Sequence, residues 1–257
     1  MRRSLLLAAL CLLAAASARP LDEDTRLHRV HRANHKVVVQ RIPAIEAKRN
    51  FCVPASVEMV VRYHGGKVTQ RDLGKIFDSS RQVGTNIAGM EKKFGTGPLA
   101  GFVCKGVYSM TVGELENVKK VYLESPDLSP ANRKRFLKRV GSKKGDLAIL
   151  DASDPRIMFD IASQARPELF KQFPEILKQY IDQGYPLLWS VAMNLDPHDR
   201  NDGFHMRVIC GYGVTDSGEI SEVIYLDPWT GRRKYKDVSL AQATAMTVSL
   251  KVVQTAE

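Results

Sequence analysis

The chain has 257 residues, of which 44% are hydrophobic and 26% are charged. This length and composition suit a globular protein with its own hydrophobic core, and they exclude disordered, fibrous and coiled-coil classes. The formal net charge of +10 at pH 7 would favour a nucleic-acid partner, because excess lysine and arginine attract phosphate.

The first eighteen residues predict a secretory signal peptide. Arg2 and Arg3 give a positive start, an apolar run over 5–16 follows, and Ala-Ser-Ala at 16–18 matches a cleavage site after Ala18. The run is short for a membrane anchor, and no other segment is long and apolar enough to cross a bilayer. We therefore expect a secreted or periplasmic protein with a net charge of +8 after cleavage, which argues against a nucleic-acid partner.

The remaining basic residues are dispersed along the chain. The densest group follows Ser129 and Pro130 on a predicted helix and its end: Lys134, Arg135, Lys138, Arg139, Lys143 and Lys144. The favoured interpretation is a solvated helix face, and weak association with an anionic cell surface is the alternative.

Residues 19–35 are polar and predict a solvated N-terminal arm. His28, His31 and His35 recur at spacings that would align them on one helical face. A metal needs convergent ligands on a rigid scaffold, and this segment offers none, so we expect no metal site.

From Lys36 onward the pattern predicts one ordered domain over 36–257. A β-branched run at 37–39 predicts a strand. Helices are predicted over 51–64 (ended by Gly65-Gly66), after Thr69, from Thr111 to about 123, from Ser129, and over 174–182.

After Pro186 the pattern changes to strands. The strand-like runs are 187–193, 205–212, 222–226 and 245–253, separated by turn residues. Helices followed by strands predict segregated layers, and hence an α+β fold.

Cys52 is the first candidate for chemistry, because it lies at the predicted start of a helix. Free backbone N–H groups and the helix dipole favour an anion there and lower the pKa of a thiol. A thiolate nucleophile also needs a general acid/base, and a third group to orient that base.

The C-terminal half offers both of those groups. His205 begins one predicted strand, and Asp227 ends the next. Adjacent antiparallel strands would bring an imidazole and a carboxylate together. The alternative interpretation is a cysteine in the core and an ordinary Asp-Pro turn.

These motifs resemble those of bacteriocin-processing cysteine peptidases (cysteine family thirty-nine), which have a papain-like fold. Residues 50–66, Asn-Phe-Cys-Val-Pro-Ala-Ser followed by an apolar helix, Tyr and Gly, are similar to the nucleophile helix of that family. Gly-Tyr-Pro at 184–186, His205 before an apolar strand, and Leu-Asp-Pro at 226–228 follow in the same order. The resemblance covers about 41–230, with an unmatched, helix-rich insertion at about 98–170.

The resemblance implies peptide-bond cleavage, with Cys52 as nucleophile, His205 as acid/base and Asp227 as its orienting carboxylate. It implies no cofactor and a peptide or protein as substrate. The chain lacks a transporter segment, so it resembles a free-standing, exported relative.

Two positions depart from the family pattern. Val53 replaces the glycine that follows the nucleophile, and Glu46 stands where papain-like enzymes place a glutamine that donates to the oxyanion. An ionised carboxylate cannot donate, so Glu46 would contribute only if it were protonated. Gln40 and Gln82 lack the expected spacing.

Two other histidines are weaker candidates for the base. His198 lies in a polar loop, and His64 is expected to be a cation at the end of its helix.

Cleavage of the signal peptide would leave Cys52, Cys104 and Cys210. If Cys52 is free, a Cys104–Cys210 disulfide is the remaining pairing. The alternative is a free, buried Cys210 in an apolar strand.

The sequence thus predicts an exported cysteine peptidase or amide hydrolase. A catalytically weak relative that binds peptides or surface ligands, and an acyltransferase of transglutaminase type, are the alternatives.

Overall fold

The computed structural model of the chain describes residues 23–80, 84–85, 87, 89–142, 147–198, 201, 203–230 and 235–256. The predicted signal peptide, Gln82, Lys143 and Lys144 lie outside the described residues. The described part confirms the α+β class, with helices packed on an eight-stranded antiparallel sheet.

The strands run in the spatial order β1-β2-β5-β4-β8-β3, and β6 and β7 extend the sheet from β5. Their bounds are β1 Val30–Ala33, β2 Lys36–Val39, β3 Phe102–Ser109, β4 Leu187–Ala192, β5 Phe204–Val214, β6 Ile220–Leu226, β7 Lys236–Ser239 and β8 Thr247–Thr255. The runs predicted at 37–39, 187–193, 205–212, 222–226 and 245–253 correspond to β2, β4, β5, β6 and β8.

The longest strand, β5, organises this sheet. Its first half pairs with β4 and its second half with β2 along one edge, while β6 follows the other edge. Gly211 lets β2 approach closely, because a Cβ there would lie 2.4 Å from the carbonyl oxygen of Val37. The start of β5 and the end of β6 thereby come together beside α3.

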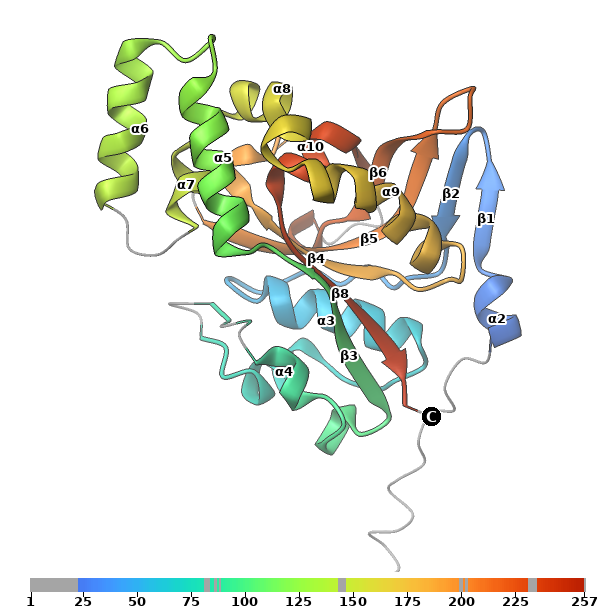
Figure 1. The fold of residues 1–257 in the computed structure, drawn as a ribbon. Coiled ribbons are helices and arrows are strands. Elements are labelled where there is room, and N and C mark those ends of the chain that lie inside the picture. The colour runs from blue at the N-terminus through green and yellow to red at the C-terminus, as the bar shows by residue number, and fades with distance from the viewer. Residues whose placement is uncertain are drawn as a thin grey trace, which may run out of the picture.

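The helices lie on both faces of the sheet. In Figure 1, α3 and α4 lie below it and α5, α8, α9 and α10 lie above it. The α-helices are α2 Glu23–Leu27, α3 Cys52–Tyr63, α4 Gln70–Ile76, α5 Val112–Glu124, α6 Pro130–Ser142, α7 Ala148–Ala152, α8 Pro155–Ala165, α9 Pro167–Ile181 and α10 Leu240–Met246. The short 3₁₀ helices are η1 Met90–Lys93, η2 Gly97–Leu99, η3 Met193–Leu195 and η4 Pro228–Thr230.

Side-chain caps start the helices where the sequence predicts them. Thr69 accepts a hydrogen bond from the N–H of Asp72, and Thr111 accepts one from the N–H of Glu114. The helix predicted from 174 begins earlier, because Pro167 starts α9 and Pro174 lies inside it. The α3 helix carries no side-chain cap, so the N–H groups of its first turn stay available.

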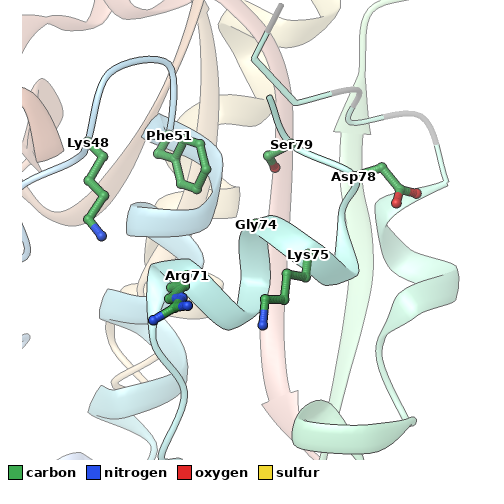
Figure 2. A pocket seen from close by; sticks show the side chains of 7 residues that line it. All are labelled: Lys48, Phe51, Arg71, Gly74, Lys75, Asp78 and Ser79. Carbon is green, nitrogen blue, oxygen red and sulfur yellow. The ribbon is translucent and has the colours of Figure 1, made fainter. Parts of the chain in front are cut away.

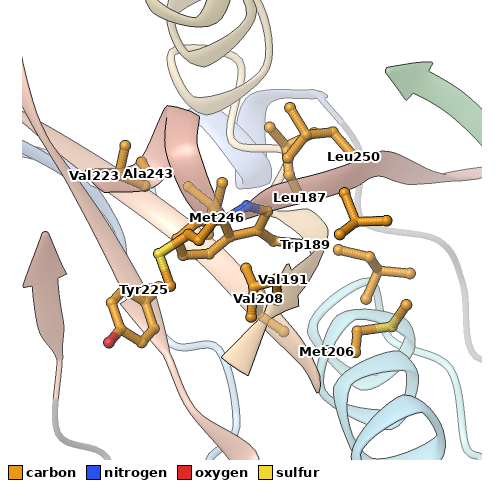
Figure 3. Packing of buried hydrophobic residues seen from close by; sticks show 14 of the residues in the cluster. Leu187, Trp189, Val191, Met206, Val208, Val223, Tyr225, Ala243, Met246 and Leu250 are labelled. Atoms are coloured by element: carbon orange, nitrogen blue, oxygen red, sulfur yellow. The ribbon is translucent and has the colours of Figure 1, made fainter. Parts of the chain in front are cut away.

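The core between the sheet and α10 is built around Trp189. Its indole N–H donates to the hydroxyl of Thr247 at 2.7 Å, and its ring packs edge-on against Tyr225 with centroids 5.5 Å apart. Figure 3 shows Trp189 enclosed by side chains of the sheet and of α10, including Met246. The indole is buried and its N–H has a hydrogen-bond partner, so Trp189 holds β4 against β8. Strand β4 in turn pairs with β5, the strand that carries His205.

The N-terminal arm is mostly exposed over its described part, as a polar arm should be, but it is ordered. Residues 23–27 form α2, and β1 pairs with β2 along its whole length, from Val30 opposite Val39 to Ala33 opposite Lys36. One edge of β2 pairs with β5, and the backbone N–H and C=O groups on its other edge also need partners. The segment 30–33 supplies them by forming β1. His28, His31 and His35 fall after α2, within β1 and in the following turn, so they share no helical face.

The insertion at about 98–170 is not purely helical. It contributes β3, which pairs with β8 from Phe102 opposite Thr255 to Ser109 opposite Ser249. Helices α5, α6, α7 and α8 follow it. The insertion therefore completes one edge of the sheet, where the sequence showed only an unmatched segment.

The Cys104–Cys210 disulfide is not formed. Cys104 lies on β3 and Cys210 on β5, and strands β4 and β8 separate them. Neighbouring strands are about 4.8 Å apart, so these sulfur atoms lie far beyond bonding distance. Both thiols are buried, and burial raises the pKa of Cys104 to about 12 and that of Cys210 further.

Among the described residues, no helix has the length and apolar character needed to span a membrane.

His64 is not a helix-terminal cation but a fully buried, neutral side chain. Burial, with the nearby positive charges of Arg26 and Arg29, lowers its pKa from 6.5 to about 3. Its ring packs against Tyr63 and Tyr185, at centroid distances of 4.9 and 5.7 Å.

We expect His64 to make the protein less stable in acid. Because its pKa is higher in the unfolded chain, the unfolded state binds the extra proton as the pH falls from about 6.5 toward about 3. The free energy of unfolding, measured with urea, should decrease over this range. His64→Phe should make the decrease shallower, and an unchanged slope would contradict this assignment.

Candidate active site

Cys52 is the first residue of α3 and is half-buried. The helix is almost wholly buried, and Ser56, one turn further on, donates its hydroxyl hydrogen to the carbonyl of Met206 at 3.0 Å. This bond ties the start of α3 to the start of β5. The sequence therefore places the thiol at a helix N-terminus, and packing brings it to the strand that carries His205.

His205 and Asp227 are brought together as the sequence predicts. The imidazole Nε2 lies 2.9 Å from Oδ1 of Asp227, and both side chains are buried. The second ring nitrogen, Nδ1, is buried and is left to face the thiol of Cys52. The three residues thus form a thiol–imidazole–carboxylate series.

The electrostatics of this series favour an ion pair. Burial alone raises the pKa of the Cys52 thiol, but the His205 ring and backbone groups of Met206 and Val53 outweigh it and lower the pKa. Burial lowers the pKa of His205, and Asp227 and Cys52 outweigh this and raise it. Each group thus stabilises the charged form of the other.

Trp229 covers the imidazole. Its ring lies over His205 with centroids 3.9 Å apart and planes inclined by 33°, and its backbone N–H donates to Oδ1 of Asp227 at 2.9 Å. The indole shields the His205–Asp227 hydrogen bond from water, which strengthens that bond.

A cleft of about 480 Å³ opens over Cys52 and His205. It is lined by Asn50, Cys52, Val53, Gly84, Thr85, Ile87, Leu147, Ser190, Phe204, His205, Met206, Trp229 and Val248. Phe204 and Trp229 are 44% and 40% exposed, which is unusual for such large apolar side chains. The cleft is therefore suited to a partly apolar ligand whose reacting group meets the thiol.

A second hollow continues this cleft toward the insertion. The two share Ile87, Leu147 and Val248, and the second is also walled by Tyr108 and Met110 of the insertion. The insertion therefore lengthens the cleft in which a ligand would lie.

Asp227 is held in turn by a fully buried arginine. The Nε of Arg207 donates to Oδ2 of Asp227 at 3.0 Å, and its Nη2 pairs with the buried Asp196. The Arg207 guanidinium also lies 4.6 Å from the ring centroid of Tyr225. Burial raises the pKa of Asp227, but His205 and Arg207 outweigh it and hold the pKa well below its usual range.

The structure does not bring Glu46 to this cleft. Its side chain is exposed and is absent from the cleft lining, while its backbone carbonyl accepts a hydrogen bond from the side chain of Gln70 at 2.8 Å. Backbone N–H groups at the start of α3, which no side chain caps, are available as donors to an oxyanion.

The remaining histidine candidate lies elsewhere. His198 is exposed, and its Nε2 is 2.9 Å from the carbonyl of Asp237. In the described portion of the chain, no three His, Cys, Asp or Glu side chains gather as a metal site would need.

Sequence reasoning missed Arg207 and Asp196 and did not give Trp229 a role. A charged residue two positions after His205, inside an otherwise apolar strand, was the available signal for Arg207. Asp196 gave no comparable signal, because it stands in an Asp-rich loop.

Comparison with known proteins finds no family model that matches the chain, and no curated protein matches its sequence significantly. The resemblance to papain-like peptidases therefore rests on the sequence motifs and stays a prediction.

We expect Arg207 to be essential for the stability of this site. Arg207→Met removes the ion-pair partner of the buried Asp196 and one of the partners of Asp227, which keeps His205, and this should cost about 3–5 kcal/mol of unfolding free energy. Adding Asp196→Asn removes the uncompensated charge of Asp196 and should recover part of that loss. Urea unfolding measures both, and a cost below about 1 kcal/mol for the single variant, or strictly additive losses, would contradict this role.

Proposed function

We propose that the protein is a cysteine hydrolase that cleaves amide bonds in peptides through Cys52, His205 and Asp227. The observation that carries the proposal is the 2.9 Å contact between His205 and Asp227 beside a thiol whose pKa is lowered. The papain-like class is part of the proposal, supported by the order of the motifs along the chain and by the nucleophile at a helix N-terminus.

In the first half of the reaction, the Cys52 thiolate attacks the carbonyl carbon and forms a tetrahedral oxyanion. The N–H groups at the start of α3 stabilise its negative charge. The protonated His205 then gives its proton to the leaving amine nitrogen, the C–N bond breaks, and a thioester on Cys52 remains.

In the second half, water attacks the thioester. Neutral His205 takes a proton from that water, the C–S bond breaks, and the carboxylic acid leaves with Cys52 as thiolate. Asp227 keeps the imidazole in the orientation that both halves require, and Trp229 keeps water away from the bond between them.

Export completes the proposal. The pattern of residues 1–18 supports action outside the cytoplasm, as a secreted or periplasmic enzyme. The substrate is then a peptide or protein met in that compartment.

We expect peptide cleavage by the wild-type chain to depend on the triad. Cys52→Ala and His205→Ala should each lower kcat/KM by roughly 10⁴-fold or more, because the nucleophile and its acid/base act as a unit. Asp227→Asn should cost less, since an amide oxygen still accepts a hydrogen bond from the ring. A peptide library incubated with each variant, with products identified by mass spectrometry, measures these rates.

Cys104→Ala is the matched control, because it removes a buried thiol that is absent from the lining of the cleft over Cys52. Cleavage that survives Cys52→Ala would exclude this mechanism. Peptide binding without any cleavage by wild type would instead favour the catalytically weak binding protein, which Glu46 and Val53 motivate.

A thioester can also pass its acyl group to an amine. We expect water to be the main acceptor, with hydroxylamine competing at high concentration to give a hydroxamate. If a primary amine at low concentration captures most of the acyl group, the acyltransferase assignment replaces hydrolysis. Quantifying acid and amide products on one peptide separates the two.

A further inference from the structure

A basic pocket lies on the other side of the loop that leads into Cys52. It has a volume of about 820 Å³ and is lined by Lys48, Phe51, Arg71, Gly74, Lys75, Asp78 and Ser79. Phe51 immediately precedes the nucleophile in the chain, and the hydroxyl of Ser79 in the pocket lies 2.6 Å from that of Thr85 in the cleft lining, so the pocket adjoins the catalytic cleft. Figure 2 shows Lys48 and Phe51 on the entering loop, facing the residues of α4.

The positive charge of this pocket is not neutralised. Among the described residues, Lys48, Arg71 and Lys75 have no ion-pair partner. The single acid of the lining, Asp78, lies 3.9 Å from Lys93. Three cations therefore face one hollow without a counter-charge of their own, which favours an anionic ligand.

The fold holds these cations in place rather than leaving them scattered. Arg71 and Lys75 are one turn apart, so they share a face of α4. The side chain of Gln70 holds the loop that carries Lys48 against α4. It accepts a hydrogen bond from the N–H of Lys48 at 2.9 Å and donates one to the carbonyl of Glu46 at 2.8 Å.

Close packing of α4 against the loop shapes the floor of the pocket. A Cβ at Gly74 would lie 2.5 Å from the ring of Phe51, so glycine permits this approach. The half-buried Phe51 ring gives the pocket an apolar base beneath its charged rim. Glu46 and Asp72, the acids nearest in sequence to its walls, are absent from the lining.

We propose that this pocket binds the carboxylates of an acidic segment in the peptide substrate, beside the bond that Cys52 attacks. The proposal rests on the proposed function, since it names the class of peptide that the site prefers. The charge complements an acidic segment, and the position next to Phe51 lets one extended peptide reach both the pocket and the thiol.

The experiment measures binding separately from cleavage. The mature chain with Cys52→Ala is titrated into fluorescein-labelled octaglutamate, with octaglutamine as the neutral probe, and the dissociation constant is read from fluorescence anisotropy. We expect octaglutamate to bind at least about tenfold more tightly than octaglutamine. Added salt should weaken the difference, as it does for exposed ion pairs.

Substitutions in the same background locate the binding. Lys48→Gln, Arg71→Gln and Lys75→Gln should each weaken octaglutamate binding by about two- to fivefold, and the triple variant by at least tenfold. The matched control also replaces two lysines and one arginine, but on α6: Arg133→Gln, Lys134→Gln and Lys138→Gln. This control should leave the affinity unchanged.

Three results would overturn the proposal: equal affinity for the two probes, equal weakening by the control triple, or tighter binding of a heparin octasaccharide at the same residues. The last result would assign the pocket to a polysaccharide.

With the active chain, the triple variant of Lys48, Arg71 and Lys75 should raise KM for a peptide with a glutamate flank and leave kcat unchanged. Octaglutamate binding by the Cys52→Ala chain, together with no cleavage of any library peptide by the active chain, would refute the proposed hydrolase while the pocket assignment stands.

Discussion

The hydrogen bond between His205 and Asp227 is the interaction on which the rest of the site depends. It exists because β5 and β6 are neighbours, and it is oriented by Arg207, which also pairs with Asp196. Each of these buried charges would be costly alone; the guanidinium of Arg207 offsets part of the charge of Asp196 and Asp227, and Asp227 also pairs with His205. Their arrangement fixes the imidazole, and the imidazole in turn makes the thiol of Cys52 acidic.

Many of the helices and strands, and the three residues of the site, could be predicted from the sequence because the patterns that indicate them are local. The caps at Thr69 and Thr111, the apolar face of α3 and the β-branched strands act over a few residues, and the structure contains each of them. Cys52 before an apolar helix, and His205 and Asp227 at strand ends, were predictable for the same reason. Strand adjacency then supplied the contact between His205 and Asp227.

The failures came from long-range contacts that leave little local trace. The N-terminal arm becomes β1 because β2 has a free edge, and β3 forms because β8 needs a partner. His64 looks like an ordinary helix-end cation until α3 is packed, when burial makes it neutral. The proposed Cys104–Cys210 bridge failed because two strands intervene, which depends on strand order rather than on spacing.

The most direct test of the account is the rate at which iodoacetamide alkylates Cys52 across pH 4–10 in a chain produced without residues 1–18. Cys104 and Cys210 are buried with raised pKa values, so Cys52 should be the reactive thiol. The account predicts an inflection below the ordinary thiol pKa of about 8.5, moved upward in His205→Ala. An inflection near the ordinary value in wild type, unchanged by His205→Ala, would contradict it.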